Sequence, residues 1–152
     1  KLRKTSFSLD RLIQETAELI EATNPTHKIE IKGKLTTNII ADKERVGEVL
    51  LNLLTNAVKY SPDSDKVEIH TSRQNGNAIV KIKDFGIGIA KKNLPFVFDR
   101  FFRVYGSEDK KYPGLGMGLY ISAEIVKRHK GKIWLRSKKN IGTTFYFSIP
   151  IK

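Results

Sequence analysis

Two asparagines and a lysine share one side of a predicted helix and could hold a metal ion and a phosphate. Asn52, Asn56 and Lys59 are four and three residues apart, so they are neighbours on a helical surface. Asparagine in a helix interior costs roughly half a kcal/mol relative to alanine, which suggests that these two have a task. Amide oxygens suit Mg²⁺, and a lysine ammonium suits phosphate. The alternative is an ordinary polar helix face.

A carboxylate stands at the end of a strand whose apolar residues alternate inward. Over 78–84 the same alternation turns Asp84 toward the core. A buried carboxylate needs hydrogen-bond donors, and the exocyclic amine of adenine would be one. Gly86 and Gly88 follow, and glycines let backbone approach a ligand closely. The alternative is a carboxylate that caps its own turn.

Thr143 repeats this argument on the last predicted strand. It shares an inward face with Phe145 and Phe147, so its hydroxyl could meet the same ligand edge as Asp84. A threonine hydroxyl can also bond to nearby backbone, which is the structural alternative.

A glycine-rich turn enters a predicted helix and could bind phosphate. Gly114, Gly116 and Gly118 precede or begin that helix, whose N-terminus presents free N–H groups. A flexible hinge is compatible with this reading. Upstream, Arg100 and Arg103 emerge from a phenylalanine cluster expected to pin the segment to the core, and such an arginine can reach a γ-phosphate.

The rest of the chain predicts the elements that hold these groups. Ser8 and Asp42 are N-cap residues for two of three helices. Helices are predicted over 9–23, 42–60 and 117–130, and strands over 28–32, 36–41, 66–73, 77–84, 132–137 and 143–150. The expected order is β-α-β-β-α-β-β-lid-α-β-β, which predicts an α+β two-layer sandwich: a mixed, mainly antiparallel sheet with three helices on one face. The long connection that ends at residue 116 is expected to be a functional lid.

Composition limits the class of protein. The 152 residues with 39% hydrophobic content suit one globular domain, and the absence of cysteine excludes disulfide scaffolds. No apolar run reaches the ~18 residues of a membrane span. The formal net charge of +12 favours an anionic partner: nucleic acid, a phosphorylated ligand or an acidic membrane surface. We read no strand as interleaving aromatic and basic residues, and we expect Asp84 to point inward. Both observations disfavour nucleic acid as the partner.

Together the motifs resemble the catalytic ATP-binding domain of bacterial sensor histidine kinases, in order and over nearly the whole chain. They are NLLTNAVKY (52–60), DFGIG (84–88), FDRFFR (98–103), GLGMGL (114–119) and GTTF (142–145). The resemblance implies the Bergerat ATP-binding fold, which the gyrase, heat-shock chaperone and mismatch-repair ATPases share. Its cofactors would be ATP and Mg²⁺, and residues 89–116 would be the ATP lid.

The resemblance also implies a role for each matched residue. Asn56 would bind Mg²⁺ with Asn52 beside it, Lys59 would contact phosphate, Tyr60 would line the adenine and ribose side, and Arg103 would approach the γ-phosphate. Asp84 would read adenine. The remaining nucleotide contacts would come from Gly86, Gly88, Gly114, Gly116, Gly118, Leu119 and Thr143.

One position separates kinases from hydrolases within this fold. The hydrolysing members carry Glu one helical turn before the Mg²⁺ asparagine, as the base for water. Here that residue is Asn52, which cannot accept a proton, and Glu48 lies a further turn away. We therefore expect phosphoryl transfer to another nucleophile and disfavour an ATP-driven dimerising clamp. The alternative within the fold, a serine kinase of the anti-sigma-factor type, usually carries this Glu as well.

The acceptor histidine is missing from the chain. His27, His70 and His129 do not lie in an H-[ED]-x-x-x-P-type box, and the chain begins with Lys1 rather than Met. We expect one catalytic domain over 1–152, with 1–4 as the remnant of a linker to an absent dimerisation and phosphoacceptor hairpin. A response regulator would act downstream. The resemblance implies a cytoplasmic domain without nucleic-acid or membrane contact, although its parent can be anchored in the inner membrane. The second class of function is a basic nucleic-acid-binding module.

Overall fold

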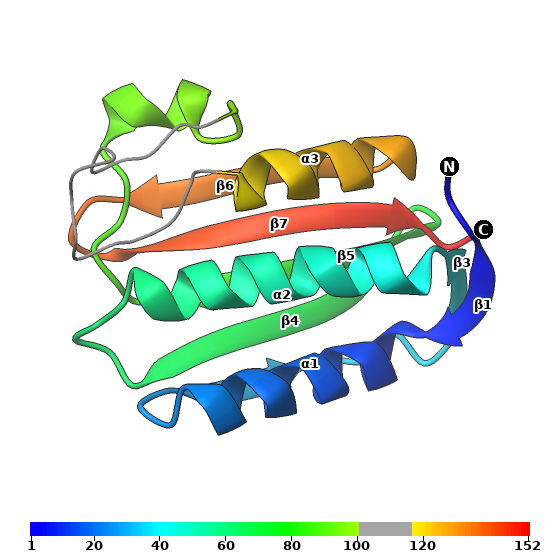
Figure 1. The fold of residues 1–152 in the computed structure, drawn as a ribbon, viewed down its shortest axis with the longest axis horizontal. Helices are drawn as coiled ribbons and strands as arrows, with labels where there is room; N and C mark the ends of the chain where they lie inside the picture. The colour runs from blue at the N-terminus through cyan, green and yellow to red at the C-terminus, as the bar shows by residue number, and fades with distance from the viewer. Residues whose placement is uncertain (101–116) are drawn as a thin grey trace.

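The computed structural model describes residues 1–100 and 117–152 as a layer of helices over a layer of strands (Figure 1). The elements in chain order are β1 (Thr5–Ser8), α1 (Leu9–Thr23), β2 (Lys28–Lys32), β3 (Asn38–Ala41), α2 (Lys43–Lys59), β4 (Lys66–Gln74), β5 (Asn77–Asp84), the 3₁₀ helix η1 (Lys91–Phe96), α3 (Gly118–Arg128), β6 (Lys132–Lys138) and β7 (Gly142–Pro150). The predicted α+β sandwich and its element order are confirmed. The sequence pattern had not indicated the bounds of β1.

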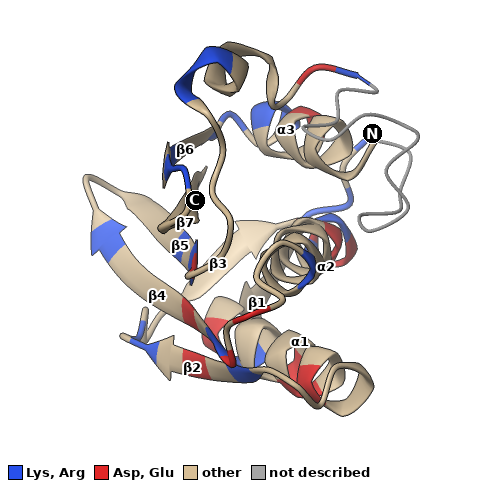
Figure 2. Ribbon diagram, turned by 90° about the vertical axis from the view of Figure 1, so that its left-hand side faces the viewer, with Lys and Arg blue, Asp and Glu red and all other residues tan. Residues whose placement is uncertain are grey.

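The strands form two sheets rather than one. The main sheet has the order β2-β4-β5-β7-β6, in which β2 and β4 are parallel and the other neighbours are antiparallel. β1 and β3 pair with each other in a small antiparallel sheet. Figure 1 shows α1, α2 and α3 lying across one face of the main sheet, and Figure 2 shows the sheet and the helices as separate layers. Among the described residues, no α-helix lies on the opposite face of the main sheet.

The core lies between these layers and is built around α2. The predicted apolar stripe of α2 is buried: Val46, Val49, Leu50, Leu53, Leu54, Ala57 and Val58. It packs against the inward residues of the central strands, among them Ile69, Val80, Ile82 and Phe147. Each fully buried side chain of this size contributes about 1.5–3 kcal/mol through removal from water. This packing fixes the end of α2 over the end of β5 and the start of β7.

Both predicted N-caps are confirmed. The Ser8 hydroxyl accepts the Arg11 N–H at 3.1 Å, and one Asp42 oxygen accepts the Arg45 N–H at 3.2 Å. The other Asp42 oxygen accepts the Arg3 N–H at 2.9 Å, and this bond is the main reason that the pKa of Asp42 is lowered. Arg3 is therefore attached to the start of α2.

His129 joins the same junction from α3. Its Nε2 accepts the Asp42 N–H at 3.0 Å, so Nδ1 carries the proton and donates it to the Ile125 carbonyl at 2.9 Å. The N-terminal segment, the start of α2 and the end of α3 thus meet at one buried point.

Element ends differ from the predictions where the backbone turns left-handed. The strand predicted over 36–41 begins only at Asn38, because Thr36 has φ 62°. The last predicted helix ends at Arg128 because Lys130 also has φ 62°. The turn predicted between β4 and β5 is confirmed by the positive φ values of Asn75 and Gly76.

One reading of the sequence is wrong. Strand β6 does interleave basic and aromatic residues, since alternate residues of a strand share a face. Its exposed positions are Lys132, Trp134, Arg136 and Lys138. They lie on the sheet face away from the helices, because Ile133 and Leu135 pack against the core.

Candidate functional site

Asp84 is buried at the end of β5, as the alternation of that strand predicts. It is 4% exposed, and one of its oxygens, Oδ1, accepts the Gly86 N–H at 3.0 Å and the Thr143 N–H at 3.1 Å. The first bond is the turn cap of the structural alternative. Among the described residues Oδ2 accepts no hydrogen bond, so it is available to an external donor. Burial without a cationic partner raises the pKa of Asp84 to about 6.

Thr143 and Asp84 are brought together as predicted, and a third residue joins them. The Thr143 hydroxyl lies 2.7 Å from the Ser137 hydroxyl, which accepts the Ile89 N–H at 2.8 Å. Sequence reasoning missed Ser137. The alternation of β6 could have indicated it, because Ser137 follows Ile133 and Leu135 on the inward face of that strand.

The glycine turn after Asp84 is wedged between two other backbone segments. A Cβ at Gly86 would collide with the carbonyl oxygen of Tyr60, and one at Gly88, where φ is +68°, would collide with that of Lys138. The Ile87 N–H donates to the Tyr60 carbonyl at 3.0 Å. These glycines therefore allow backbone to approach backbone, and they bring Asp84 close to the end of α2.

The polar residues Asn52, Asn56 and Lys59 of α2 make different contacts. Asn52 donates from Nδ2 to the Gly118 carbonyl and to the Ser122 hydroxyl, both at 3.3 Å, and so ties α2 to α3. Asn56 is half-buried, and its side chain makes no hydrogen bond to a described residue. The Lys59 ammonium lies 5.7 Å from the centre of the Tyr60 ring. Asn56 is thus the member of the pair that is open to a ligand.

The start of α3 is open to an anion. Within the part of the chain that the structure describes, no side chain caps this helix, so its first N–H groups lack a side-chain acceptor. A Cβ at Gly118 would lie 3.7 Å from the nearest Asn52 atom, an ordinary contact, so these neighbours do not require glycine. Leu119 is half-buried against the core.

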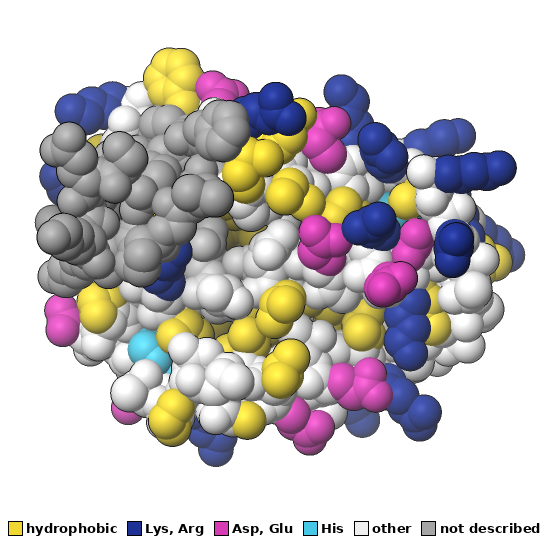
Figure 3. Space-filling model, in the orientation of Figure 1, with side chains coloured by type: hydrophobic (Ala, Val, Ile, Leu, Met, Phe, Trp, Pro, Cys, Tyr) yellow, Lys and Arg dark blue, Asp and Glu magenta, His cyan; other side chains and the backbone are white. Residues whose placement is uncertain are grey.

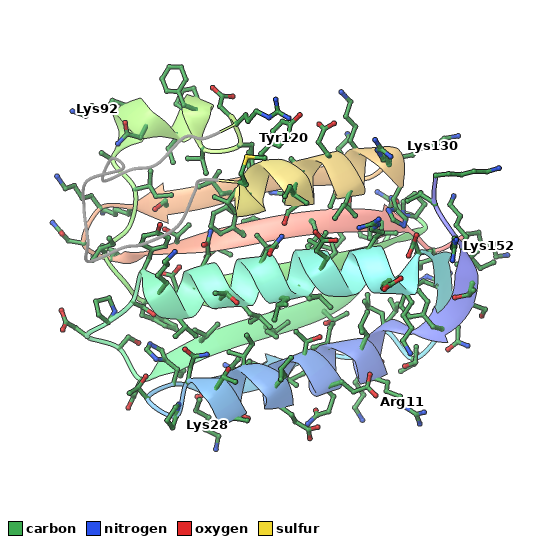
Figure 4. All side chains as sticks on the ribbon, in the orientation of Figure 1. Arg11, Lys28, Lys92, Tyr120, Lys130 and Lys152 are labelled. Atoms are coloured by element: carbon green, nitrogen blue, oxygen red, sulfur yellow. The ribbon has the colours of Figure 1, made fainter. Side chains whose placement is uncertain are left out.

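Tyr120, labelled in Figure 4, lies in the first turn of α3, and the Arg100 guanidinium is 5.3 Å from the centre of its ring. Arg103, Gly114 and Gly116, with most of the expected lid, lie outside the described residues.

The three histidines hold the fold together. His27 is buried, with Nε2 2.9 Å from the Ser61 carbonyl. His70 lies 3.0 Å from Glu68 on the sheet, and His129 is part of the Asp42 junction. Each of the three thus has a structural contact within the fold.

All these groups lie at one end of the molecule. The end of α2, the end of β5, and the starts of β7 and α3 meet there, away from both termini (Figure 1). A buried carboxylate can accept a hydrogen bond from an amine, and a helix N-terminus that no described side chain caps can hold a phosphate. The fold and this arrangement define the class of two-layer sandwiches that bind nucleotides.

The comparisons with known proteins specify the family. The chain belongs to the family described as Histidine kinase-, DNA gyrase B-, and HSP90-like ATPase, whose model matches residues 41–152. It is 37% identical over 146 residues to the sensor protein RprX of Bacteroides fragilis, covering 88% of this chain and 28% of that protein. It is 41% identical over 113 residues to the sensor histidine kinase WalK of Bacillus subtilis, covering 73% and 18%. The chain thus spans less than a third of these relatives.

Solved structures show the same architecture. The catalytic domain of the histidine kinase ThkA in a nucleotide-free form has a TM-score of 0.84 at 27% identity, covering 99% of this chain and 97% of that one. Full-length ShkA in complex with AMPPNP has a TM-score of 0.85 at 25% identity, covering 99% and 31%. The family resemblance drawn from the motifs is confirmed.

Residues 1–100 and 117–152 contain no group of three or more His, Asp or Glu side chains that could hold a metal ion. None of their helices has the length and apolar character needed to cross a membrane.

Proposed function

We propose that the chain binds ATP between the end of α2, the end of β5 and the start of β7, and passes the γ-phosphoryl to a histidine of another domain. The observation that carries the proposal is Asp84, a buried carboxylate that contacts no cation among the described residues and whose Oδ2 accepts no hydrogen bond from them. An adenine amine donating to Oδ2 would satisfy it. The similarity to a kinase solved with AMPPNP supports this choice of ligand.

The phosphates would lie toward α2 and α3. The N–H groups at the N-terminus of α3, at Gly118, would bind the phosphates. Lys59 would contact phosphate as well. Gly114 and Gly116, the other residues of the glycine turn, lead into this helix. Asn56 offers one amide oxygen, which suits Mg²⁺ because this ion keeps most of its ligands as water and phosphate oxygens. Bound there, Mg²⁺ would neutralise phosphate charge. Arg103 would contact the γ-phosphate late, when the acceptor has docked.

Transfer is favoured over hydrolysis by what surrounds Asn56. Asn52 uses its amide to hold α3, and Glu48 is paired with Arg45 at 3.1 Å. Neither is placed to take a proton from water. In the transfer, an imidazole nitrogen forms a bond to the γ-phosphorus while the bond from that phosphorus to the departing ADP oxygen breaks.

The remaining assignments follow from this function. Residues 1–152 would be one catalytic domain on the cytoplasmic side, working on a dimeric helical-hairpin domain of the parent protein, with a response regulator downstream. Residues 1–4 would be the end of the joint. Arg3 contacts Asp42, so the joint would meet the domain at the start of α2.

Asp84→Asn tests the nucleotide assignment. Asn replaces an acceptor-only group with one that can also donate, so the adenine amine loses its partner. Calorimetry should show at least a 100-fold loss of MgATP affinity while circular dichroism stays unchanged. The exposed Asp63→Asn is the matched control and should bind ATP as the wild type does. An unchanged affinity in Asp84→Asn would remove the basis of the proposal.

A further inference from the structure

The face of the main sheet opposite the helices, here called the outer face, is strongly basic. Strand alternation places on it eight Lys or Arg residues and two Glu residues: Lys28, Lys32, Lys66, Lys81, Lys83, Lys132, Arg136 and Lys138, with Glu30 and Glu68. Figure 2 shows blue segments on β2, β4 and β6 of this layer. On the helix side, by contrast, acidic side chains are interspersed among the basic ones (Figure 3).

One of the two acids is already neutralised. Glu68 is buried beneath Lys32 and Lys66, each 3.4 Å away, and His70 at 3.0 Å. The hydrogen bond from His70 is the main cause that lowers the pKa of Glu68 to about 2. Within the five described strands, this leaves Glu30 alone against the other cations. The outer face thus attracts anions over its whole width.

Aromatic rings lie among these cations. Trp134 and Tyr146 are stacked with their centres 5.2 Å apart, and Arg136 lies 6.0 Å from the Tyr146 ring. Lys66 and Lys83 lie 4.9 and 5.0 Å from the Phe85 ring. Each of these rings thus contacts a cation or a second ring on the outer face.

The outer face also presents exposed apolar groups at one end. Ile141, in the turn between β6 and β7, is 62% exposed and follows Lys138 and Lys139, while Phe85 and Trp134 are each 36% exposed. A pocket of about 330 Å³ at the sheet end near Ile141 is lined by Phe85 and Ile141, by the cations Lys83, Arg136 and Lys138, and also by Asp84, Ser137 and Thr143 among others. Apolar groups ringed by cations suit a surface that has both an anionic layer and hydrocarbon beneath it.

We propose that the outer face binds an anionic lipid bilayer, with the turn that carries Ile141 entering the headgroup region. Clusters of four to eight Lys or Arg residues are typical of binding to anionic lipids, and the outer face carries eight. Tryptophan and tyrosine favour the same interface. The helices lie on the other face of the sheet, so the end of α2 and the start of α3 stay uncovered in a bound domain. This reverses the expectation of no membrane contact.

The single tryptophan of the chain lies on the proposed surface and reports contact directly. We expect the whole chain to sediment with vesicles of phosphatidylglycerol and phosphatidylcholine, less at high salt, and not with phosphatidylcholine alone. Trp134 emission should shift to shorter wavelength on binding. The triple variant K132Q/R136Q/K138Q should bind about 100-fold more weakly, as expected for three surface cations.

The matched control removes the same charge from the helix side. The triple variant K43Q/K127Q/R128Q changes three exposed residues of α2 and α3 and should bind vesicles within about threefold of wild type. Ile141→Ser changes no charge and should weaken binding several-fold. Absence of binding to anionic vesicles, equal losses in the two triple variants, or no effect of Ile141→Ser would overturn the proposal. So would an oligonucleotide or polyglutamate that binds as tightly and shifts Trp134 equally.

Discussion

At the scale of single residues, the molecule holds a carboxylate in the core without a counter-charge. Asp84 is supported by two backbone N–H groups on one oxygen, and desolvation still dominates its pKa. Such a group destabilises the empty domain and becomes favourable when a ligand supplies a further donor. Asp84 thus lowers the stability of the ligand-free domain and provides an acceptor for the ligand.

This cost should be visible in the pH dependence of stability. The native pKa of Asp84, about 6, lies above its ordinary value of 3.8. Below pH 3.8 the Asp84 carboxyl is neutral in the folded and in the unfolded chain. Between pH 3.8 and about 6 only the unfolded chain releases this proton, so the free energy of unfolding falls as the pH rises. Above about pH 6 it levels off. Urea unfolding of the ligand-free chain should therefore show wild type losing about 2 kcal/mol relative to Asp84→Asn between pH 4.5 and pH 7. Parallel curves for the two proteins would show that the carboxylate is not desolvated.

Arg103 belongs to the same scale, although it lies outside the described residues. If it contacts the γ-phosphate only in the transition state, Arg103→Ala keeps ATP affinity within a few-fold and slows transfer by roughly 10²–10³. Arg100 is the control, since it lies over the Tyr120 ring and its loss should matter less. Affinity and single-turnover transfer should be measured in both variants. Equal loss of affinity and rate in Arg103→Ala would mean that the arginine only binds ground-state ATP.

At the scale of elements, the site depends on how closely the turn after β5 approaches the end of α2. Gly86→Ala would push a methyl group into the Tyr60 carbonyl, and we expect a loss of about 1–3 kcal/mol or more. Gly47→Ala in α2 meets only a Leu12 methyl at 3.7 Å and should gain up to about 1 kcal/mol in helix propensity. Urea unfolding of both variants measures the difference. A Gly86→Ala variant as stable as wild type would show that this contact can relax freely.

The elements also show which features could be predicted from sequence. Helix α2 was predictable because its apolar residues follow the helical period and Asp42 caps it, and Asp84 because its strand alternates. The role of Asn52 was not, because its partners Gly118 and Ser122 are 66 and 70 residues away along the chain. A strand before the first helix was expected, but the bounds of β1 were not predicted, because its four residues carry no clear alternation and their partner is the distant β3. Local patterns predict elements, whereas contacts between elements need the fold.

At the scale of the whole molecule, the two faces of the sheet have different tasks. The helix side carries the proposed ATP site, far from the termini, and the outer face carries half of the formal net charge of +12. The chain spans 28% of its Bacteroides relative and 18% of its Bacillus relative, which is consistent with a catalytic part that acts on another domain.

The most direct test is transfer between separate chains. The chain is incubated with γ-labelled MgATP, alone and with a helical-hairpin domain that carries the acceptor histidine of the parent protein. We predict no label on the chain alone, very slow ATP hydrolysis, and acid-labile label on the hairpin domain only. Label on His27, His70 or His129 of the isolated chain, or ATP consumed equally fast without the hairpin domain, would contradict the account.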